Sequence, residues 1–381
     1  MEKLSRRGFL KAASVATIAA AASRSLAAPL IASHGRQRVF VASGTADGIL
    51  AYVWHPANGE LAPDGVAAQL GNVAWITSSG DGRFLFAASA ASSFNGKATG
   101  EVASFRVLNG ELQPISAQNS AGAGTCHVAL DQTGRVLLAA DYNGGSAASF
   151  LVTDGKLSPA VWNEIYIGSG PNKDRQEKAH AHFASFSPDN RFAYINDLGG
   201  DCIHIYWLNS ETAALTSAGS YRARAGAGPR TLHFYPNEHT AYSVNELDST
   251  VDVLEWRRAD GSLRLITRIE LLPKGYDGPT RACDTVISQD GRFVYFANRD
   301  NNFLYSFRAN SASGGLTPIA RSNCGGRTPR NFVLDPTENW MLVANQDSNL
   351  ISVFRRDTVS GALAGDGKSF AAAAPMRILF A

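Results

Sequence analysis

One sequence motif recurs seven times along this chain, and this repetition constrains the fold more than any other feature. The two clearest copies occupy residues 183–197 and 285–299, where an apolar run, an Asp-Asn or Asp-Gly pair and Arg-Phe follow in the same order. The matching anchor positions are residues 39, 84, 136, 192, 240, 293 and 340, which lie 45 to 56 residues apart. A repeat of roughly 50 residues is typical of the blades of β-propellers.

Each repeat has the residue pattern of four short strands. Its apolar runs of four to six residues are rich in β-branched and aromatic side chains, and Gly, Asn or Asp residues bound them. We therefore predict an all-β fold, a seven-bladed β-propeller with four-stranded antiparallel blades. Two stacked β-sandwiches would explain the strands but would leave the sevenfold repeat unexplained.

The end of the chain carries one further strand-like segment, residues 376–380. We expect this segment to pair with the first-blade strands that begin near Arg38. Such a pairing would close the ring of blades and would leave no open sheet edge.

The first 27 residues have the layout of an export signal. The pair Arg6-Arg7 precedes an Ala-rich apolar stretch over residues 12–22, and small residues surround a predicted cleavage site after Ala27. The arginine pair followed by Phe-Leu-Lys resembles the twin-arginine signal of bacteria. We expect a signal peptide over residues 1–27, a single propeller domain over residues 28–381, and a periplasmic or secreted protein that the twin-arginine export machinery carries. The alternative is an amphipathic N-terminal helix, although the stretch is apolar on all sides.

The charge of the chain points to no charged macromolecule as a partner. The sequence holds 35 Lys and Arg residues against 33 Asp and Glu residues, a net charge of +2. Five basic residues and one acidic residue belong to the predicted signal peptide, so the rest of the chain has a net charge of −2. We therefore expect no nucleic acid as a partner. No apolar run reaches the ~18–20 residues that a membrane-spanning helix needs, so we expect no membrane span.

Several kinds of active site are excluded because the sequence lacks their motifs. It has no G-x-S-x-G nucleophile motif, no H-E-x-x-H zinc motif, no Walker loop and no dinucleotide-binding fingerprint. The four cysteines form no C-x-x-C pair. One disulfide between two of them is an alternative that the sequence leaves open. His180 and His182 would face the same side of a strand as two metal ligands, but no third ligand is evident and nearby arginines would repel a cation. We predict no metal and no cofactor.

Polar and charged residues interrupt the repeat at two places, the start of the first strand and the end of the second. Because neighbouring strands run antiparallel, both places lie at the same face of the ring. The residues at first-strand starts are His127, His182, Arg230, Asp284 and Arg330, and those at second-strand ends are Asp141, Asp197, Glu246, Arg299 and Asn345. Their convergence on one mouth of the central channel predicts a binding or catalytic site. For any single residue, the alternative is an ion pair that joins two blades.

The residues around this mouth resemble one enzyme family over essentially the whole chain after the signal peptide. The matching motifs are Arg175-Gln176, His180-Ala181-His182, Asp197-Leu198-Gly199-Gly200-Asp201, Gly226-Ala227-Gly228-Pro229-Arg230, Val244-Asn245-Glu246-Leu247, Asn298-Arg299, Pro329-Arg330-Asn331-Phe332 and Val343-Ala344-Asn345-Gln346-Asp347. In these motifs the chain resembles the seven-bladed propeller lactonases, which include bacterial 6-phosphogluconolactonases and fungal carboxymuconate cyclases.

Two motifs depart from the pattern of that family. The Pro-Arg pair of the fifth repeat is usually followed by His, and here Thr231 stands in its place. The second repeat usually begins with Asn-Pro-Ser-Tyr and ends with Asn-Glu, where this chain has Asn72-Val73-Ala74-Trp75 and Ser89-Ala90. The altered blade reaches the same mouth, so the departures concern the identity of the substrate more than the fold.

The cyclase branch of the family implies a set of four acting residues, which are His182, Glu246, Arg230 and Arg299 in this chain. Opening a lactone needs a base to activate water, donors for the oxyanion and an acid for the leaving alkoxide. An imidazole titrates near neutrality, and a carboxylate beside arginines stays ionised, so these residue types suit the reaction. We expect the substrate to be bound by Arg175, His127, His180, Asp197, Arg330 and Asn345.

The resemblance and the predicted export together imply an exported lactonase, similar to 6-phosphogluconolactonases, that hydrolyses a sugar lactone. Phosphorylated sugar lactones are made in the cytoplasm, so export favours an unphosphorylated aldonolactone. Two alternatives stay open. One is the cycloisomerisation of a muconate-type diacid, and the other is a non-catalytic propeller that binds a ligand, since propellers have many unrelated functions.

Overall fold

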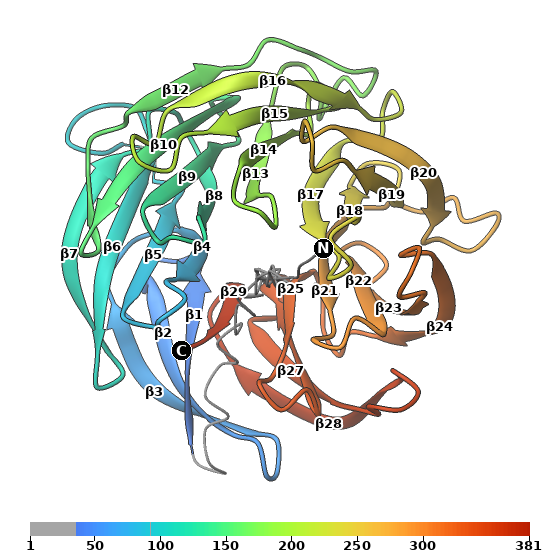
Figure 1. Ribbon diagram of the computed structural model, residues 1–381. Coiled ribbons are helices and arrows are strands. Elements are labelled where there is room, and N and C mark those ends of the chain that lie inside the picture. Colours follow the sequence, from blue (N-terminus) through green and yellow to red (C-terminus); the bar gives the residue numbers. More distant parts are fainter. Residues whose placement is uncertain (1–35, 92) are drawn as a thin grey trace, which may run out of the picture. The chain divides into compact units, whose positions relative to one another are not determined.

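Seven antiparallel β-sheets follow one another around a ring in the computed structural model of the protein (Figure 1). The structure describes residues 36–91 and 93–381, so the predicted signal peptide, residues 1–27, lies outside the described residues. Within those ranges the only helix is the 3₁₀ turn η1 (Gln346–Ser348). The all-β, seven-bladed prediction is thereby confirmed. No helix in the described part of the chain is long and apolar enough to cross a membrane.

Each sheet is one blade, and its strands run in order from the innermost to the outermost. The first blade consists of β29 (Pro375–Phe380), β1 (Gln37–Ser43), β2 (Ile49–His55) and β3 (Glu60–Ala68). The second consists of β4 (Val73–Ser78), β5 (Phe84–Ser89), β6 (Glu101–Leu108) and β7 (Glu111–Asn119). The third consists of β8 (Thr125–Leu130), β9 (Val136–Asp141) and β10 (Ser146–Thr153), with the outer place shared by β11 (Lys156–Leu157) and β12 (Trp162–Ile165).

The other four blades have four strands each, in the order of the sequence. The fourth consists of β13 (Ala181–Phe186), β14 (Phe192–Asp197), β15 (Cys202–Leu208) and β16 (Leu215–Arg222). The fifth consists of β17 (Pro229–Phe234), β18 (Thr240–Asn245), β19 (Thr250–Trp256) and β20 (Leu263–Glu270). The sixth consists of β21 (Ala282–Ile287), β22 (Phe293–Asn298), β23 (Phe303–Ala309) and β24 (Leu316–Asn323). The seventh consists of β25 (Pro329–Leu334), β26 (Trp340–Asn345), β27 (Leu350–Arg356) and β28 (Leu363–Ala371).

The second strands of the blades form the most deeply buried part of the ring. In β5, β9, β14, β18, β22 and β26, all six residues are buried. A strand that neighbouring blades cover on both faces needs small or apolar residues at nearly every position, which explains the apolar runs of the repeat. The seven anchor positions of the sequence repeat fall at or within two residues of the start of these strands and of β1.

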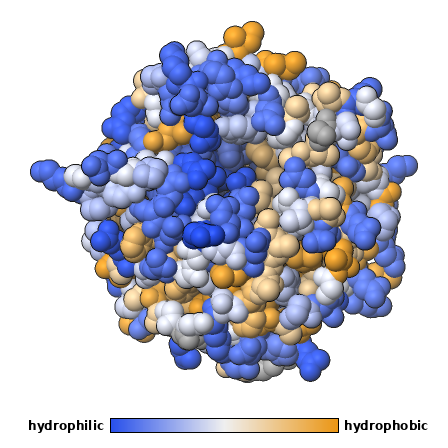
Figure 2. Space-filling model, turned by 180° about the vertical axis from the view of Figure 1, so that it is seen from behind, coloured by the Kyte–Doolittle hydropathy of each residue, from blue (hydrophilic) through white to orange (hydrophobic). Residues whose placement is uncertain are grey.

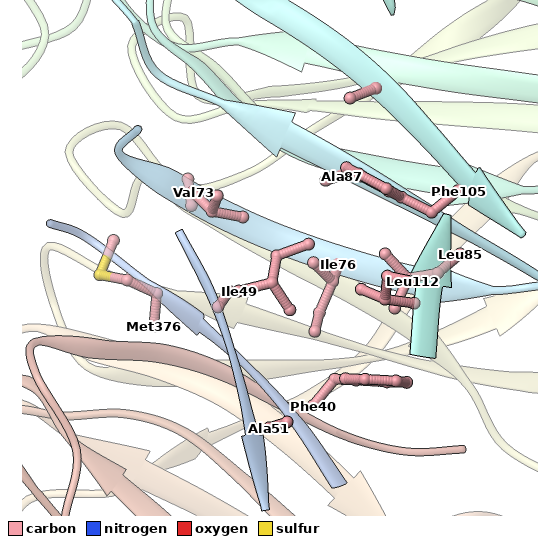
Figure 3. Packing of buried hydrophobic residues seen from close by; sticks show 13 residues of the cluster. Phe40, Ile49, Ala51, Val73, Ile76, Leu85, Ala87, Phe105, Leu112 and Met376 are labelled. Atoms are coloured by element: carbon pink, nitrogen blue, oxygen red, sulfur yellow. The ribbon is translucent and has the colours of Figure 1, made fainter. Parts of the chain in front are cut away.

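Hydrophobic clusters between the blades hold the ring together. The cluster in Figure 3 joins Phe40 and Ile49 of the first blade to Ile76 and Leu85 of the second, and Met376 of β29 adds its side chain to the same cluster. Figure 2 shows one face of the molecule, on which hydrophobic residues are scattered among hydrophilic ones around a hollow near its middle.

The turn between the first two strands explains the Asp-Asn and Asp-Gly pairs of the motif. In the fourth blade, the Ser187 hydroxyl accepts hydrogen bonds from the backbone N–H groups of Arg191 and Phe192, at 3.1 and 2.9 Å. Asn190 has a φ of 58°, a left-handed conformation that Asn and Gly adopt more easily than other residues. The sixth blade has Gly291 at the matching place, with a φ of 71°. The Asp-Asn and Asp-Gly pairs of the sequence therefore mark one turn.

The last strand closes the ring, as the sequence predicts. β29 pairs with β1 in antiparallel register, with Val39 opposite Phe380 and Val41 opposite Ile378. β29 takes the innermost place in a blade whose other three strands come from the start of the chain. The two ends of the described chain thus share one sheet, and β1 has a partner on both sides.

Candidate active site

An open cavity of about 310 Å³ lies where the seven blades meet at one mouth of the channel. All seven blades contribute to its lining, from Met376 of the first blade to Arg330 of the seventh. Its other chemically informative lining residues are Asn72, Ala74, Ala90, Cys126, Tyr142, Arg175, His182, Glu246 and Arg299. The mouth that the sequence predicts from strand starts and strand ends is therefore a real cavity.

A β-bulge near the start of every innermost strand aims side chains at this mouth. In β13, Ala181 faces Asp197 and Phe183 faces Asn196, so His182 is one residue more than its partner strand accommodates. The same shift occurs in the other six innermost strands, where the extra residue is Ala74, Cys126, Arg230, Arg330 or Met376, or belongs to the pair Cys283-Asp284. A bulge re-aims a side chain and is common next to active sites. All of these single extra residues line the large cavity or a smaller one beside it.

Glu246 is the centre of a buried ion cluster. It follows β18, has no exposed surface, and binds three arginines. Its Oε1 accepts a hydrogen bond from Nη2 of Arg175 at 2.6 Å. Its Oε2 lies 2.9 Å from Nε of Arg230 and 2.6 Å from Nη2 of Arg299, in ion pairs that lack linear hydrogen-bond geometry. Three of the four predicted catalytic residues are thus in direct contact.

The charges of this cluster fix the protonation states of the site. Burial by itself would raise the pKa of Glu246, but Arg299 and Arg230 hold the pKa of this carboxyl well below its usual range. Burial and the positive charge of Arg230 lower the pKa of His182 well below its ordinary value, while Glu246 acts in the opposite direction. His182 is therefore neutral at pH 7. Its residue type alone suggests titration near neutrality, and its buried position beside arginines corrects that expectation.

Arg330 is the cation of the cavity that no carboxylate neutralises. Its Nη1 donates a hydrogen bond to Oε1 of Gln346 at 3.3 Å, and no ion pair to it is found among residues 36–91 and 93–381. Burial, then the charges of Arg299 and Arg230, lower the pKa of Arg330 to about 9. The site has four arginines against Glu246, so a substrate oxygen that carries negative charge is favoured there.

Two further predicted residues lie at or beside the cavity. Arg175 comes from the loop between β12 and β13, and its guanidinium donates to the hydroxyl of Tyr142 as well as to Glu246. His127 of β8 lies in the smaller cavity beside the large one, where its ring is held between Trp75 and Phe183.

Three residues predicted to bind substrate do not line either cavity. His180 precedes β13, and its ring nitrogens face the carbonyl of Tyr142 at 2.9 Å and the carboxylate of Glu177 at 3.1 Å. Asp197 accepts hydrogen bonds from the backbone N–H groups of His180 and Gly200. The third is Asn345, whose amide donates to the Ser352 hydroxyl at 2.9 Å. Through these contacts, all three side chains stabilise the polypeptide around the mouth and do not face the cavity.

Neither a metal centre nor a disulfide is found in the part of the chain that the structure describes. There, no group of three His, Cys, Asp or Glu side chains is arranged to hold a metal ion. His180 and His182 do not form a ligand pair, since the ring nitrogens of His180 face Tyr142 and Glu177 instead. All four cysteines are free thiols.

Reasoning from the sequence missed Tyr142 and Met376. Tyr142 directly follows the end of β9, so its place could have been inferred from the rule that second-strand ends reach the mouth. Met376 belongs to the closing strand, which the sequence treated as a structural element only. Asn72, Ala74 and Ala90, at the altered motifs of the second blade, also line the cavity, whereas the altered Thr231 does not.

Comparison with known proteins identifies relatives of this chain. The family model described as "Lactonase, 7-bladed beta-propeller" matches residues 38–380. The 6-phosphogluconolactonase of Bacillus subtilis is 33% identical over 302 residues, which cover 78% of this chain and 84% of the relative. That of Formosa agariphila is 31% identical over 252 residues, covering 64% of this chain and 70% of the relative.

Two solved structures are similar to this chain in fold and in sequence. The periplasmic gluconolactonase of Pseudomonas aeruginosa superimposes with a TM-score of 0.84 and 30% sequence identity, covering 91% of this chain and 99% of that protein. A protein of Lactobacillus plantarum superimposes with a TM-score of 0.85 and 25% sequence identity, covering 91% of this chain and 100% of that protein. The chain therefore belongs to the seven-bladed β-propeller lactonases, a family of lactone-hydrolysing enzymes.

Proposed function

We propose that this protein hydrolyses a sugar lactone of the aldonolactone type in the cavity around His182 and Glu246. The observation that carries the proposal is that a neutral imidazole, a buried carboxylate and three arginines line one open cavity, while Arg230 binds the same carboxylate from the small cavity beside it. Relatives named as 6-phosphogluconolactonases and as a gluconolactonase support the choice of a sugar lactone.

The residues of the cavity suit each part of the reaction. Water adds to the carbonyl carbon of the lactone and gives up one proton, the bond between that carbon and the ring oxygen breaks, and the ring oxygen takes up one proton. We expect Arg330 and Arg299, which both line the cavity, to stabilise the oxyanion that forms in the first step, because cationic donors favour developing negative charge. His182, being neutral, has one nitrogen that donates and one that accepts a proton.

Glu246 is suited to holding the site together. Its very low pKa makes it a weak base at pH 7, since three arginines stabilise its ionised form. A carboxylate in this position keeps three cationic side chains close together that would otherwise repel one another. Its expected contribution to turnover is therefore the placement of Arg175, Arg230 and Arg299, and the orientation of the attacking water.

The surplus of positive charge supports a second candidate function. A muconate-type diacid carries two negative charges, and Arg330 lacks a carboxylate partner within the described residues. Cycloisomerisation of such a diacid would use the same imidazole and the same cations. A non-catalytic binding propeller is the third reading, and it would give neither reaction.

Proton release distinguishes these functions. Hydrolysis of a lactone gives a carboxylic acid that is ionised at neutral pH, so each turnover releases one proton. The full chain is assayed in a pH-stat with glucono-1,5-lactone, with its 6-phosphate, and separately with muconate by ultraviolet absorbance. We expect acid release from at least one lactone far above the spontaneous rate. Conversion of muconate alone would establish the cycloisomerase, and no reaction with any of the three would favour the binding propeller.

We also propose that residues 1–27 direct twin-arginine export to the periplasm or the medium. The motif around Arg6 and Arg7 supports this, and an exported enzyme meets unphosphorylated aldonolactones more readily than phosphorylated ones. With both Arg6 and Arg7 changed to Lys, the protein is expected to stay in the cytoplasm, as cell fractionation would show. The control replaces Lys3 and Lys11 with Arg, which keeps the pair. Normal export of the double Lys variant would contradict the assignment.

A further inference from the structure

A second, small cavity lies beside the large one and shares part of its lining. Its volume is about 10 Å³, roughly the room that one water molecule needs. His127 and His182 both line it, together with Arg230. Both histidines are more than nine-tenths buried, with exposures of 4% and 8%. Nε2 of His127 and Nδ1 of His182 are buried polar atoms without a hydrogen-bond partner. Two such atoms at one small cavity point to a shared ligand, because buried polar groups are normally satisfied.

The proton of His127 is fixed by its other nitrogen. Nδ1 of His127 lies 3.2 Å from the backbone N–H of Ala184, which can only donate, so Nδ1 accepts and carries no proton. Burial lowers the pKa of His127 well below its ordinary value, so the ring is neutral. A neutral imidazole with a bare Nδ1 has its proton on Nε2. The ring cannot turn away easily, because Trp75 and Phe183 hold it at centroid distances of 4.4 and 3.9 Å.

In His182, it is Nδ1 that lacks a hydrogen-bond partner, whereas in His127 it is Nε2. Nδ1 of His182 is the buried nitrogen, which leaves Nε2 as the nitrogen available to a molecule in the large cavity. Which nitrogen carries the proton is set by the hydrogen bond that the other one makes. The partner of Nδ1 therefore decides whether His182 presents a donor or an acceptor to the substrate.

We propose that one water molecule bound in the small cavity joins Nε2–H of His127 to Nδ1 of His182, and that this bridge keeps the proton of His182 on Nε2. His127 is then a positioning residue that acts on the substrate through His182. The geometry of donors sets the direction of the bridge. The water oxygen accepts from His127, and its second lone pair faces the guanidinium of Arg230, whose Nε is also buried without a linear hydrogen bond. Its hydrogens are left to donate, and Nδ1 of His182 is a buried acceptor without another partner on a residue that lines the cavity.

The consequence for the reaction is a fixed hydrogen-bond donor. Nε2–H of His182 faces the large cavity, where it can donate to the oxyanion or to the ring oxygen of a lactone as negative charge develops there. Burial, and after it the neighbouring positive charge of Arg230, lower the pKa of His182 and keep the ring from taking a second proton. The donor is thus present over a broad pH range without any change in the charge of the site.

The tautomers can be observed directly by NMR. The full-length protein is labelled with ¹⁵N in its eight histidines, and the signals of His127 and His182 are assigned from His127→Gln and His182→Gln variants. We expect both rings to be neutral at pH 7, with the proton on Nε2 in each. A proton on Nδ1 of His182 would overturn the proposal. This readout needs no substrate, so it stands or falls independently of the proposed lactonase activity.

A pair of substitutions tests the bridge by turnover, and this arm does rest on the proposed activity. His127→Asn keeps an acceptor for the Ala184 N–H but is too short to replace Nε2–H, whereas His127→Gln keeps a donor near the position of Nε2. We expect His127→Asn to lower kcat on the order of 10- to 100-fold with little change in KM, and to give His182 a mixture of tautomers, because a misplaced group is costly in turnover. His127→Gln should recover most of the turnover. Equal losses in both variants would show that His127 serves packing only, and wild-type turnover in both would also refute the bridge.

Discussion

Removal of residues 374–381 is expected to unfold the whole ring. The deletion takes away β29, so β1 loses one of its two partners and the interior of the ring is exposed. It also removes Ile378 and Met376 from two inter-blade clusters, and a hydrogen bond from the Ile378 N–H to Asn331. Burying one large apolar side chain is worth about 1.5–3 kcal/mol, so the combined loss approaches the whole stability of a typical domain.

Thermal unfolding followed by circular dichroism measures this effect. We expect the truncated chain to lack a cooperative transition, or to melt far below the full chain. The matched control removes Ala381 alone, which is exposed and contributes one backbone hydrogen bond to Arg38. An unchanged melting temperature in the longer deletion would mean that β29 does not close the ring.

Glu246→Gln is the second change with a large expected effect, and it should lower both stability and turnover. The substitution keeps the size of the side chain but leaves Arg175, Arg230 and Arg299 without their shared counter-charge. Removing one partner of a buried ion pair typically costs about 3–5 kcal/mol. The loss of arginine placement should lower kcat by about two orders of magnitude or more. The structure thus adds a structural role to a residue that the family resemblance marks as catalytic.

A surface glutamate provides the control for this experiment. Glu255 also contacts two arginines, Arg264 at 2.7 Å and Arg257 at 3.5 Å, but its side chain is 34% exposed to solvent. Because ion pairs that water reaches contribute little, Glu255→Gln should leave melting and turnover unchanged. If Glu246→Gln behaves like Glu255→Gln in both measurements, the buried cluster has neither of the roles assigned to it.

The fold could be predicted from the sequence because each blade repeats the same physical problem. A second strand covered on both faces needs small or apolar residues at nearly every position, and the turn before it needs a residue such as Asn190 or Gly291 in a left-handed conformation. These two requirements recur every 45 to 56 residues, and the sequence shows them as apolar runs that follow an Asp-Asn or Asp-Gly pair in the clearest copies. The closing strand could be predicted as well, since a ring leaves β1 no other partner.

The site could be predicted only in part, because its geometry depends on the bulges. Alternation along a regular strand places His180 and His182 on the same face, yet His182 is the extra residue of a bulge and His180 precedes the strand. No glycine marks the bulge in β13, so the sequence shows no sign of it. The arginines and Glu246 were placed correctly at the mouth. Their mutual contacts depend on the rotation between blades, which the sequence does not encode in any short motif.

The turnover of His182→Gln tests most directly the claim that this cavity is the active site. We predict that kcat of this variant falls by about 100-fold or more on the lactone that the wild type hydrolyses, while its melting temperature stays close to that of the wild type. We also predict that wild-type kcat is constant between about pH 6.5 and pH 8, since His182 is neutral and Glu246 is ionised throughout that interval. The control is His239→Gln, at an exposed histidine, which should turn over like the wild type. A His182→Gln variant that keeps near-normal turnover per folded molecule would contradict this assignment and would place the chemistry elsewhere in the protein.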